Sequence, residues 1–233
     1  SELVSKPANP LSLIAGQPLG EISVTGLSPV GTDHTNPKLF YQNDLQFNDN
    51  IFWQLGRHNL KTGFTFQRFQ FNGYQESHTR GRLRFNSVAD LLTFNVKDLE
   101  GSDPNSDFTR GYRQSLFGLF VHDDLKFTRR LTLNLGMRYD FVTSPAEVNG
   151  KVANLRSIND PAVTMGGNLF NTPKTGIAPR IGFAYDAFGN GKTALRGGFG
   201  IFHVQPLFSS YRSAGYGSLP FVRTRVLSPA EVN

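Results

Sequence analysis

The stretch Leu131-Thr132-Leu133-Asn134-Leu135-Gly136-Met137-Arg138-Tyr139-Asp140-Phe141 alternates apolar and polar residues almost without a break. Successive side chains of a β-strand point to opposite sides of the sheet, so this strand has one apolar face and one polar face. Two different surroundings must therefore contact the two faces.

Comparable alternation in neighbouring stretches predicts three β-hairpins, at about 39–73, 109–142 and 177–203. Their turns are expected at Gly56-Arg57-His58, at Thr128-Arg129-Arg130 and at Gly189-Asn190-Gly191. In the second half of the first hairpin the apolar residues occupy even-numbered positions up to Phe66 but odd-numbered positions at Phe69 and Phe71. A β-bulge near Gln67 would explain this shift.

The links between the hairpins are much longer than the turns within them. Residues 72–108 and 142–176 form connections of about 35 residues, where a median near 5 is usual in compact domains. A further long stretch follows Phe202. Short and long connections therefore alternate along the chain. Within the first long connection, Ser87–Asn95 is expected to form one short helix that is capped by Ser87.

Strand length and aromatic positions favour a membrane barrel. At about 3.3 Å per residue, 131–141 extends about 33 Å, and a tilt near 40° reduces this to about 25 Å, the height of a barrel's lipid-facing band. Two interfacial girdles are expected: Trp53, Phe127 and Tyr185 near the short turns, and Tyr41, Tyr139 and Phe141 near the long loops. The pattern predicts an all-β fold, an antiparallel meander of about seven or eight long strands. It would be part of a transmembrane β-barrel with short periplasmic turns and long extracellular loops.

Composition excludes several classes of protein. The 233 residues include no cysteine, which excludes a disulfide scaffold, a thiolate metal site and a thiol nucleophile. The longest apolar run, Leu116–Val121, is too short for a spanning helix of about 20 residues, and Ser1–Pro7 does not read as a signal peptide. The net charge of +6 comes from basic residues scattered among acidic ones, so no nucleic-acid partner is expected.

Five stretches resemble the hairpins of Oar-like TonB-dependent receptors, which are bacterial outer-membrane proteins. They are Gly56–Phe64, Phe120–Lys126, Arg130–Tyr139, Ala178–Asp186 and Lys192–Phe202. The resemblance implies an outer-membrane location and, in a whole receptor, a plug and a barrel of about 22 strands. It also implies TonB-dependent uptake of a bulky ligand such as a siderophore, a glycan or a peptide. The implied partners are outer-membrane lipid and lipopolysaccharide, the receptor's own plug domain, TonB and the imported ligand, whose identity is unknown.

The sequence has no recognisable plug, no TonB-box-like start and no final strand that ends in an aromatic residue. We therefore expect residues 1–233 to be an interior fragment of the barrel domain of such a receptor. The parts that couple transport to an energy source would lie outside this sequence.

No motif indicates catalysis or a cofactor. Gly189–Thr193 resembles the end of a phosphate-binding loop, but Asp186 occupies the place of the required glycine and a strand follows. We interpret this segment as a hairpin turn in which glycine and asparagine supply positive φ angles. The five histidines show no metal-ligand spacing, and neither a Gly-x-Ser-x-Gly motif nor a spaced acid pair is present. We expect no enzyme activity, no cofactor and no metal.

Charged residues at the strand positions that alternate with the apolar ones are the candidates for function. A charge that faces lipid at mid-depth costs about 2 to 4 kcal/mol, so these side chains are expected to face the barrel lumen. They could pair across strands, contact a plug or bind a transported ligand, and structural ion pairs are the simpler interpretation. The candidates are His122, Asp124, Arg138, Asp140, Arg180, Asp186 and Arg196.

Two alternatives to a TonB-dependent receptor remain open. A passive porin or an adhesin-like structural barrel would share the strand pattern but would lack a plug. A soluble β-sandwich binding module would cover its apolar face with a second sheet. The surroundings of the apolar face distinguish the sandwich from the barrels.

Overall fold

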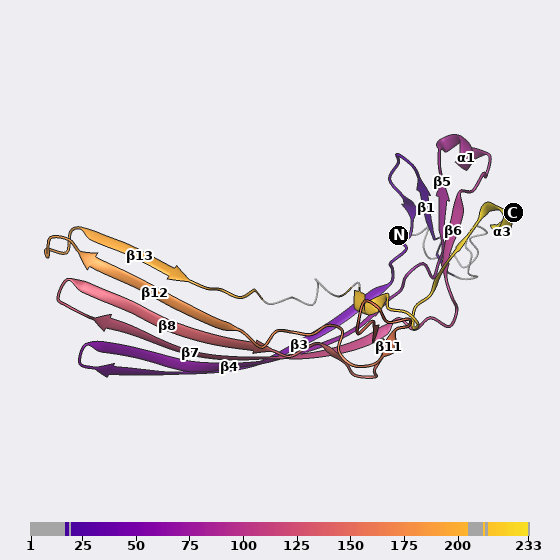
Figure 1. Ribbon diagram of the computed structural model, residues 1–233. Helices are drawn as coiled ribbons and strands as arrows, with labels where there is room; N and C mark the ends of the chain where they lie inside the picture. Colours follow the sequence, from indigo (N-terminus) through magenta and orange to yellow (C-terminus); the bar gives the residue numbers. More distant parts are fainter. Residues whose placement is uncertain (1–16, 19, 205–211, 213, 233) are drawn as a thin grey trace.

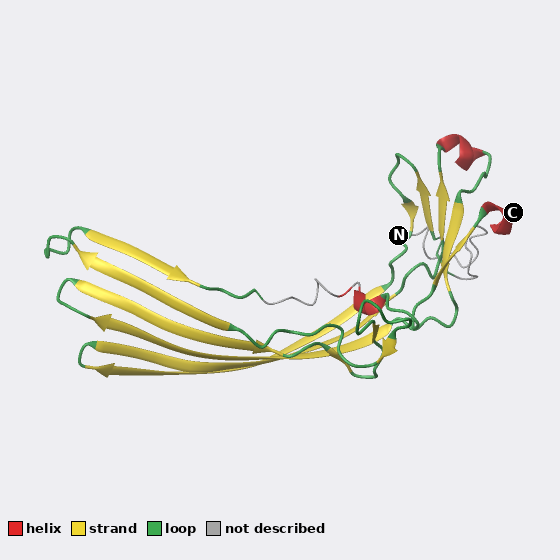
Figure 2. Ribbon diagram, in the orientation of Figure 1, coloured by secondary structure: helices red, strands yellow, loops and turns green. Residues whose placement is uncertain are grey.

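Long antiparallel strands dominate the protein, whose computed structural model describes residues 17, 18, 20–204, 212 and 214–232 (Figures 1 and 2). The large sheet contains β3 (Lys38–Leu55), β4 (His58–Gln75), β7 (Thr109–Lys126), β8 (Leu131–Val142), β12 (Ile177–Asp186) and β13 (Ala194–Gly200). Their order, β13-β12-β8-β7-β4-β3, is a simple meander. The two-residue strand β9 (Ala146–Glu147) pairs with β7 and is the seventh member. The expected all-β, antiparallel fold class is confirmed, and six of the seven strands of this sheet are long, where about seven or eight long strands were expected.

The three hairpin turns lie together at one end of the large sheet, and the long connections lie at the other end (Figure 1). Gly56 and Arg57 join β3 to β4, and Gly56 has a φ of 59°, which suits glycine at the first position of a two-residue hairpin turn. In the third turn Gly189 and Gly191 both have a φ of 71°. Asn190 does not have a positive φ, so the expectation that asparagine also supplies one is wrong.

The predicted β-bulge near Gln67 is absent. β4 pairs residue by residue with β3 and with β7 on both sides of Gln67. Phe69 and Phe71 therefore lie on the polar face, where Phe71 contributes to a small apolar core between the sheet and the long connections. We call this cluster the loop core, and its members are Phe71, Tyr112, Val152, Leu169 and Tyr216. The phenylalanines of β4 thus change from one face of the sheet to the other because the surroundings of the strand change along its length, while the strand itself stays regular.

A second, smaller sheet rises at the end where the long connections lie (Figure 1). Its strands are β1 (Glu21–Val24), β2 (Val30–Gly31), β5 (Arg82–Phe85), β6 (Asp98–Ser102) and β14 (Thr224–Leu227), in the order β14-β6-β5-β1-β2. Val24, Phe85 and Val96 form its core. Most of the first long connection is therefore folded rather than irregular.

The remaining described elements are short. β10 (Ala153–Asn154) and β11 (Thr164–Met165) form a two-stranded sheet, and α3 (Pro229–Val232) follows β14. The helix α1 (Val88–Leu92) begins at Ser87, whose side chain accepts a hydrogen bond from the Asp90 N–H, as predicted. Within the described ranges, no helix has the length and apolar character that crossing a membrane requires.

The apolar face of the large sheet is not covered by any described part of the chain. Side chains at its centre stay exposed, Leu119 by 59 %, Met137 by 52 % and Ile181 by 57 %. A soluble sandwich would bury these residues under a second sheet. The sandwich alternative is therefore wrong, because the second sheet that exists here has its own core at the end of the strands.

Candidate functional site

The charged residues singled out in the sequence lie on the polar face of the large sheet. The pairing register places all of them on that face: His122, Asp124, Arg138, Asp140, Arg180, Asp186 and Arg196. They do not form one cluster. They form one ion pair, one histidine–carboxylate contact and one turn contact, and two arginines stand apart.

The histidine–carboxylate contact lies within β7 and the ion pair lies within β8, so neither runs across strands. His122 Nε2 lies 3.0 Å from Asp124 Oδ1, and Arg138 Nε lies 2.7 Å from Asp140 Oδ2. Gly118 stands opposite Asp140, and a Cβ atom there would lie 2.7 Å from both Arg138 Nη2 and Asp140 Oδ1. Glycine leaves the space that this pair occupies, and it offers no side chain for the expected pairing across strands.

The other three candidates have different surroundings. Asp186 accepts hydrogen bonds from the backbone N–H groups of Gly189 and Gly191, each at 2.9 Å, so it stabilises the third turn. The Arg180 guanidinium lies 4.6 Å from the centre of the Phe202 ring, a cation–π contact. Arg196 is exposed and has no ion pair with another described residue.

A pocket of about 230 Å³ opens beside the Arg138–Asp140 pair at the loop end of the polar face. Its lining includes Asp140, Val142, Phe170, Thr172, Gly176 and His203. Thr172 Oγ1 donates a hydrogen bond of 2.6 Å to the Val142 carbonyl, which fixes this connection to the end of β8. A carboxylate beside an apolar wall can accept hydrogen bonds from the hydroxyl or amide groups of a ligand.

The loop core holds the connection 143–176 against the polar face. Val152 is completely buried, and Tyr112 is 2 % exposed. The buried carboxylate of Glu147 accepts hydrogen bonds of 2.8 Å from the backbone N–H groups of Gly111, Asn149 and Lys151. The sequence pattern does not predict this anchor. Its only signal in the sequence is the change from even-numbered to odd-numbered apolar positions at Phe69 and Phe71, which does not require a bulge.

Charged side chains of the second sheet surround two stacked histidines. The rings of His34 and His78 lie 4.5 Å apart. Glu21 lies 2.6 Å from His34 Nδ1 and 2.9 Å from Arg82 Nε, and Glu100 lies 3.2 Å from His78 Nε2. The network joins β1 to β5 and β6. Among the described residues, no group of three or more histidine and acidic side chains could hold a metal ion.

Acid is expected to loosen the second sheet. Burial lowers the pKa of His78 below its ordinary value of 6.5, and the charges of His34 and Arg82 lower it further, against Glu100 and Glu21. Burial raises the pKa of Glu21, but the hydrogen bonds and charge of His34 and the charge of Arg82 outweigh burial and keep this pKa below 4.5. His78 and Glu21 therefore both have a higher pKa in the unfolded chain than in the folded protein. Their stabilising contributions are therefore complete above the ordinary pKa values and are lost as the pH falls through the folded-state values.

Hydrogen exchange measures this loss. The amides of β1, β5 and β6 should lose protection as the pH falls from about 7 to about 4, after correction for intrinsic exchange rates, while those of β8 stay protected. His78→Asn should remove the part of the loss of protection that begins below pH 6.5. Asparagine is chosen because it tolerates the φ of 57° at this position. Constant protection of the second sheet over this range would contradict the expectation.

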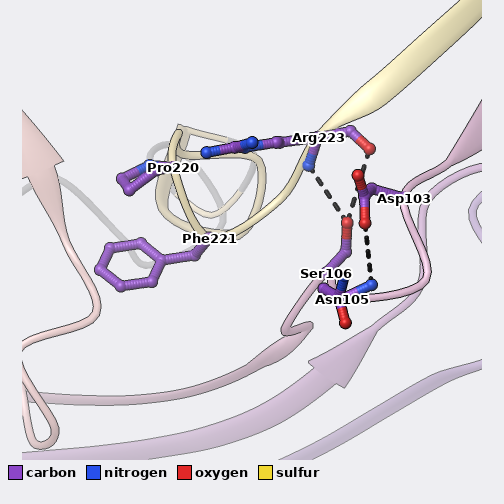
Figure 3. Close-up of a pocket in the computed structure, with 6 residues that line it drawn as sticks. All are labelled: Asp103, Asn105, Ser106, Pro220, Phe221 and Arg223. Carbon is purple, nitrogen blue, oxygen red and sulfur yellow. Dashed lines mark hydrogen bonds between the residues drawn. The ribbon is translucent and has the colours of Figure 1, made fainter.

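A second pocket of about 230 Å³ lies where the connection before β7 meets the segment that leads to β14 (Figure 3). Asp103 accepts a hydrogen bond of 3.0 Å from the Asn105 N–H, and Ser106 Oγ accepts one of 3.2 Å from the Arg223 N–H. The Asp103 N–H in turn donates to the Arg223 carbonyl at 2.8 Å. These polar groups serve to join two segments, so the polar face of the large sheet is the better candidate site.

Comparison with known proteins supports a membrane location for the large sheet. The family model of an outer membrane beta barrel domain matches residues 5–232. No curated protein and no solved structure matches the chain. The matched range contains both sheets and all the connections between them.

Proposed function

Because the chain belongs to the outer membrane beta barrel domain family, we propose that it forms part of the wall and mouth of an Oar-like TonB-dependent receptor. The protein lies in the bacterial outer membrane. Its apolar face contacts lipid, its polar face lines the lumen, its short turns face the periplasm and its long connections face the outside. In the proposed receptor, TonB drives movement of a plug domain to import a bulky ligand, and the chain itself has no enzymatic activity.

The observation that carries the proposal is that the connection 143–176 is folded over the polar face at the loop end. The loop core packs the connection 143–176 on the lumen face, and a pocket remains beside Asp140. A fixed surface with a defined pocket suits capture of a specific ligand. A passive channel needs only an open, water-filled lumen.

Two open edges support a barrel of more strands than are described here. Neither β3 nor β13 has a partner on its outer side among the described strands. A sheet in contact with lipid must close, because unpaired backbone groups cannot remain in hydrocarbon. The six long strands are also fewer than the eight or so of the smallest closed barrels of this class. Further strands therefore complete the wall on both sides.

Conductance distinguishes a receptor from a passive porin. We expect the full-length protein in a planar bilayer, with KCl on both sides, to pass no steady current, because a plug blocks the lumen. A porin from the same membrane serves as the positive control. A steady open-channel current from the full-length protein would contradict the receptor and favour the porin.

A structural or adhesin-like barrel would also remain closed, so a second measurement is needed. Chemical cross-linking in intact cells should capture the full-length protein together with TonB. A neighbouring outer-membrane porin should not be captured under the same conditions. A closed barrel that never cross-links to TonB would contradict the proposed import function.

A further inference from the structure

Four phenylalanine rings form a row across the apolar face, midway along β3, β4 and β7 and at the loop end of β8. Phe47, Phe66, Phe117 and Phe141 are paired in register on β3, β4, β7 and β8. The distances between neighbouring ring centroids are 6.4, 5.1 and 6.2 Å. Aromatic girdles mark the interfaces of membrane barrels. This phenylalanine row therefore marks the height at which hydrocarbon gives way to headgroups on the outer side.

Beyond the phenylalanine row, towards the loop end, most residues on the same face of β3, β4 and β7 are polar, and the charged ones among them are all positive. The next positions on this face are Leu45, Asn43 and Tyr41 on β3, Arg68, Gln70 and Asn72 on β4, and Ser115, Arg113 and Gly111 on β7. None of these positions holds a carboxylate. Tyr41, expected in the outer girdle, lies in this polar zone instead.

Arg68 and Arg113 are neighbours in this zone. Arg68 pairs with Ser115, and Arg113 stands two positions farther along β7, a diagonal arrangement with about 7 to 8 Å between residues. Arg68 Nη1 donates to Ser115 Oγ at 2.8 Å, and Arg113 Nη1 donates to the Tyr112 carbonyl at 2.9 Å. These bonds orient both guanidinium groups and leave further N–H donors. No described carboxylate pairs with either arginine.

We propose that Arg68 and Arg113 bind the phosphate groups of lipid A in the outer leaflet. Arginine matches phosphate with paired, charge-assisted hydrogen bonds. At about 3.3 Å per residue, the two arginines stand about 7 and about 13 Å beyond the phenylalanine row along their strands. Lipid A carries its phosphates on sugars directly above its acyl chains, which places them at this height. The long connections face outside, so the leaflet is the lipid A leaflet. The site depends on the outer-membrane location and not on TonB-dependent import.

Native mass spectrometry of the full-length protein with bisphosphorylated lipid A tests the site. Arg68→Gln combined with Arg113→Gln should weaken lipid A binding by about tenfold, because two charged donors are lost. Arg57→Gln combined with Arg129→Gln removes the same charge at the opposite end and should retain wild-type binding. Heat-dependent migration in gels shows whether each variant is folded.

The wild type alone also tests the proposal, whatever happens to the variants. It should bind bisphosphorylated lipid A more tightly than dephosphorylated lipid A and more tightly than phosphatidylglycerol. Equal binding with and without the phosphates would overturn the site, and so would a preference for phosphatidylglycerol. Equal losses in the two double variants would indicate general charge attraction and would also overturn it. None of these measurements depends on plug, TonB or transport.

Discussion

Met137→Arg is expected to destabilise the folded protein in a bilayer by about 2 to 4 kcal/mol. Met137 lies at the centre of the apolar face, between Val121 on β7 and Pro179 on β12. An arginine there would face hydrocarbon at mid-depth. If water contacted this face, the same change would cost about 0.5 kcal/mol or less, as exposed substitutions usually do. The size of the loss in stability therefore shows whether lipid or water contacts the apolar face.

Asn134→Arg is the matched control on the same strand. Asn134 points to the polar face, opposite Asp124, where water and a carboxylate can accommodate the new charge. We expect a change of less than about 1 kcal/mol. Urea unfolding of the full-length protein in phospholipid vesicles compares the two variants. Similar stabilities for both variants would contradict contact between Met137 and lipid.

Phe71→Ala is expected to weaken docking of the connection 143–176 by about 3 to 5 kcal/mol, the usual cost of removing a buried aromatic ring. Phe71 is 7 % exposed, and its ring centroid lies 6.5 Å from that of Tyr216 in the loop core. Because it lies beyond the phenylalanine row, the wall strands should remain folded. The pocket beside Asp140 should lose its fixed shape.

Hydrogen exchange at the amides of 146–153 measures this docking directly. Ile158→Ala changes the same connection at a side chain that is 93 % exposed, and it should leave exchange unchanged. Unaltered protection at 146–153 in Phe71→Ala would show that another contact holds the connection. Loss of protection throughout β8 would instead show that Phe71 supports the whole wall.

The large sheet could be predicted because its information is local. In β8 every second residue from Leu131 to Phe141 is apolar, and each hairpin turn follows directly in the chain. The second sheet could not be predicted in this way. β1 pairs in parallel with β5, and β14 pairs with β6 although Thr224 and Ser102 lie far apart in the sequence. Strands of two to five residues are too short to show a period, so only their tertiary partners define them.

Parity identified the face of each candidate residue but not its contacts. The register placed Arg138 and Asp140 on the polar face as expected, whereas the pair they form depends on the missing side chain at Gly118. The same limit explains why the position of Phe71 wrongly suggested a bulge. Alternation shows the surroundings of a side chain and not the regularity of the strand. Arg68 and Arg113 stand out only when the register aligns the phenylalanine row across four strands.

Spin-label accessibility along 131–141 tests the lipid-facing wall most directly. The chain contains no cysteine, so single cysteines can be introduced at each position and labelled in the full-length protein in lipid vesicles. Labels at odd positions such as Leu135 and Met137 should collide frequently with oxygen, and labels at even positions such as Asn134 should collide with a water-soluble nickel complex. Low accessibility to both reagents at Leu135 and Met137 would mean that protein covers this face, and it would contradict the account.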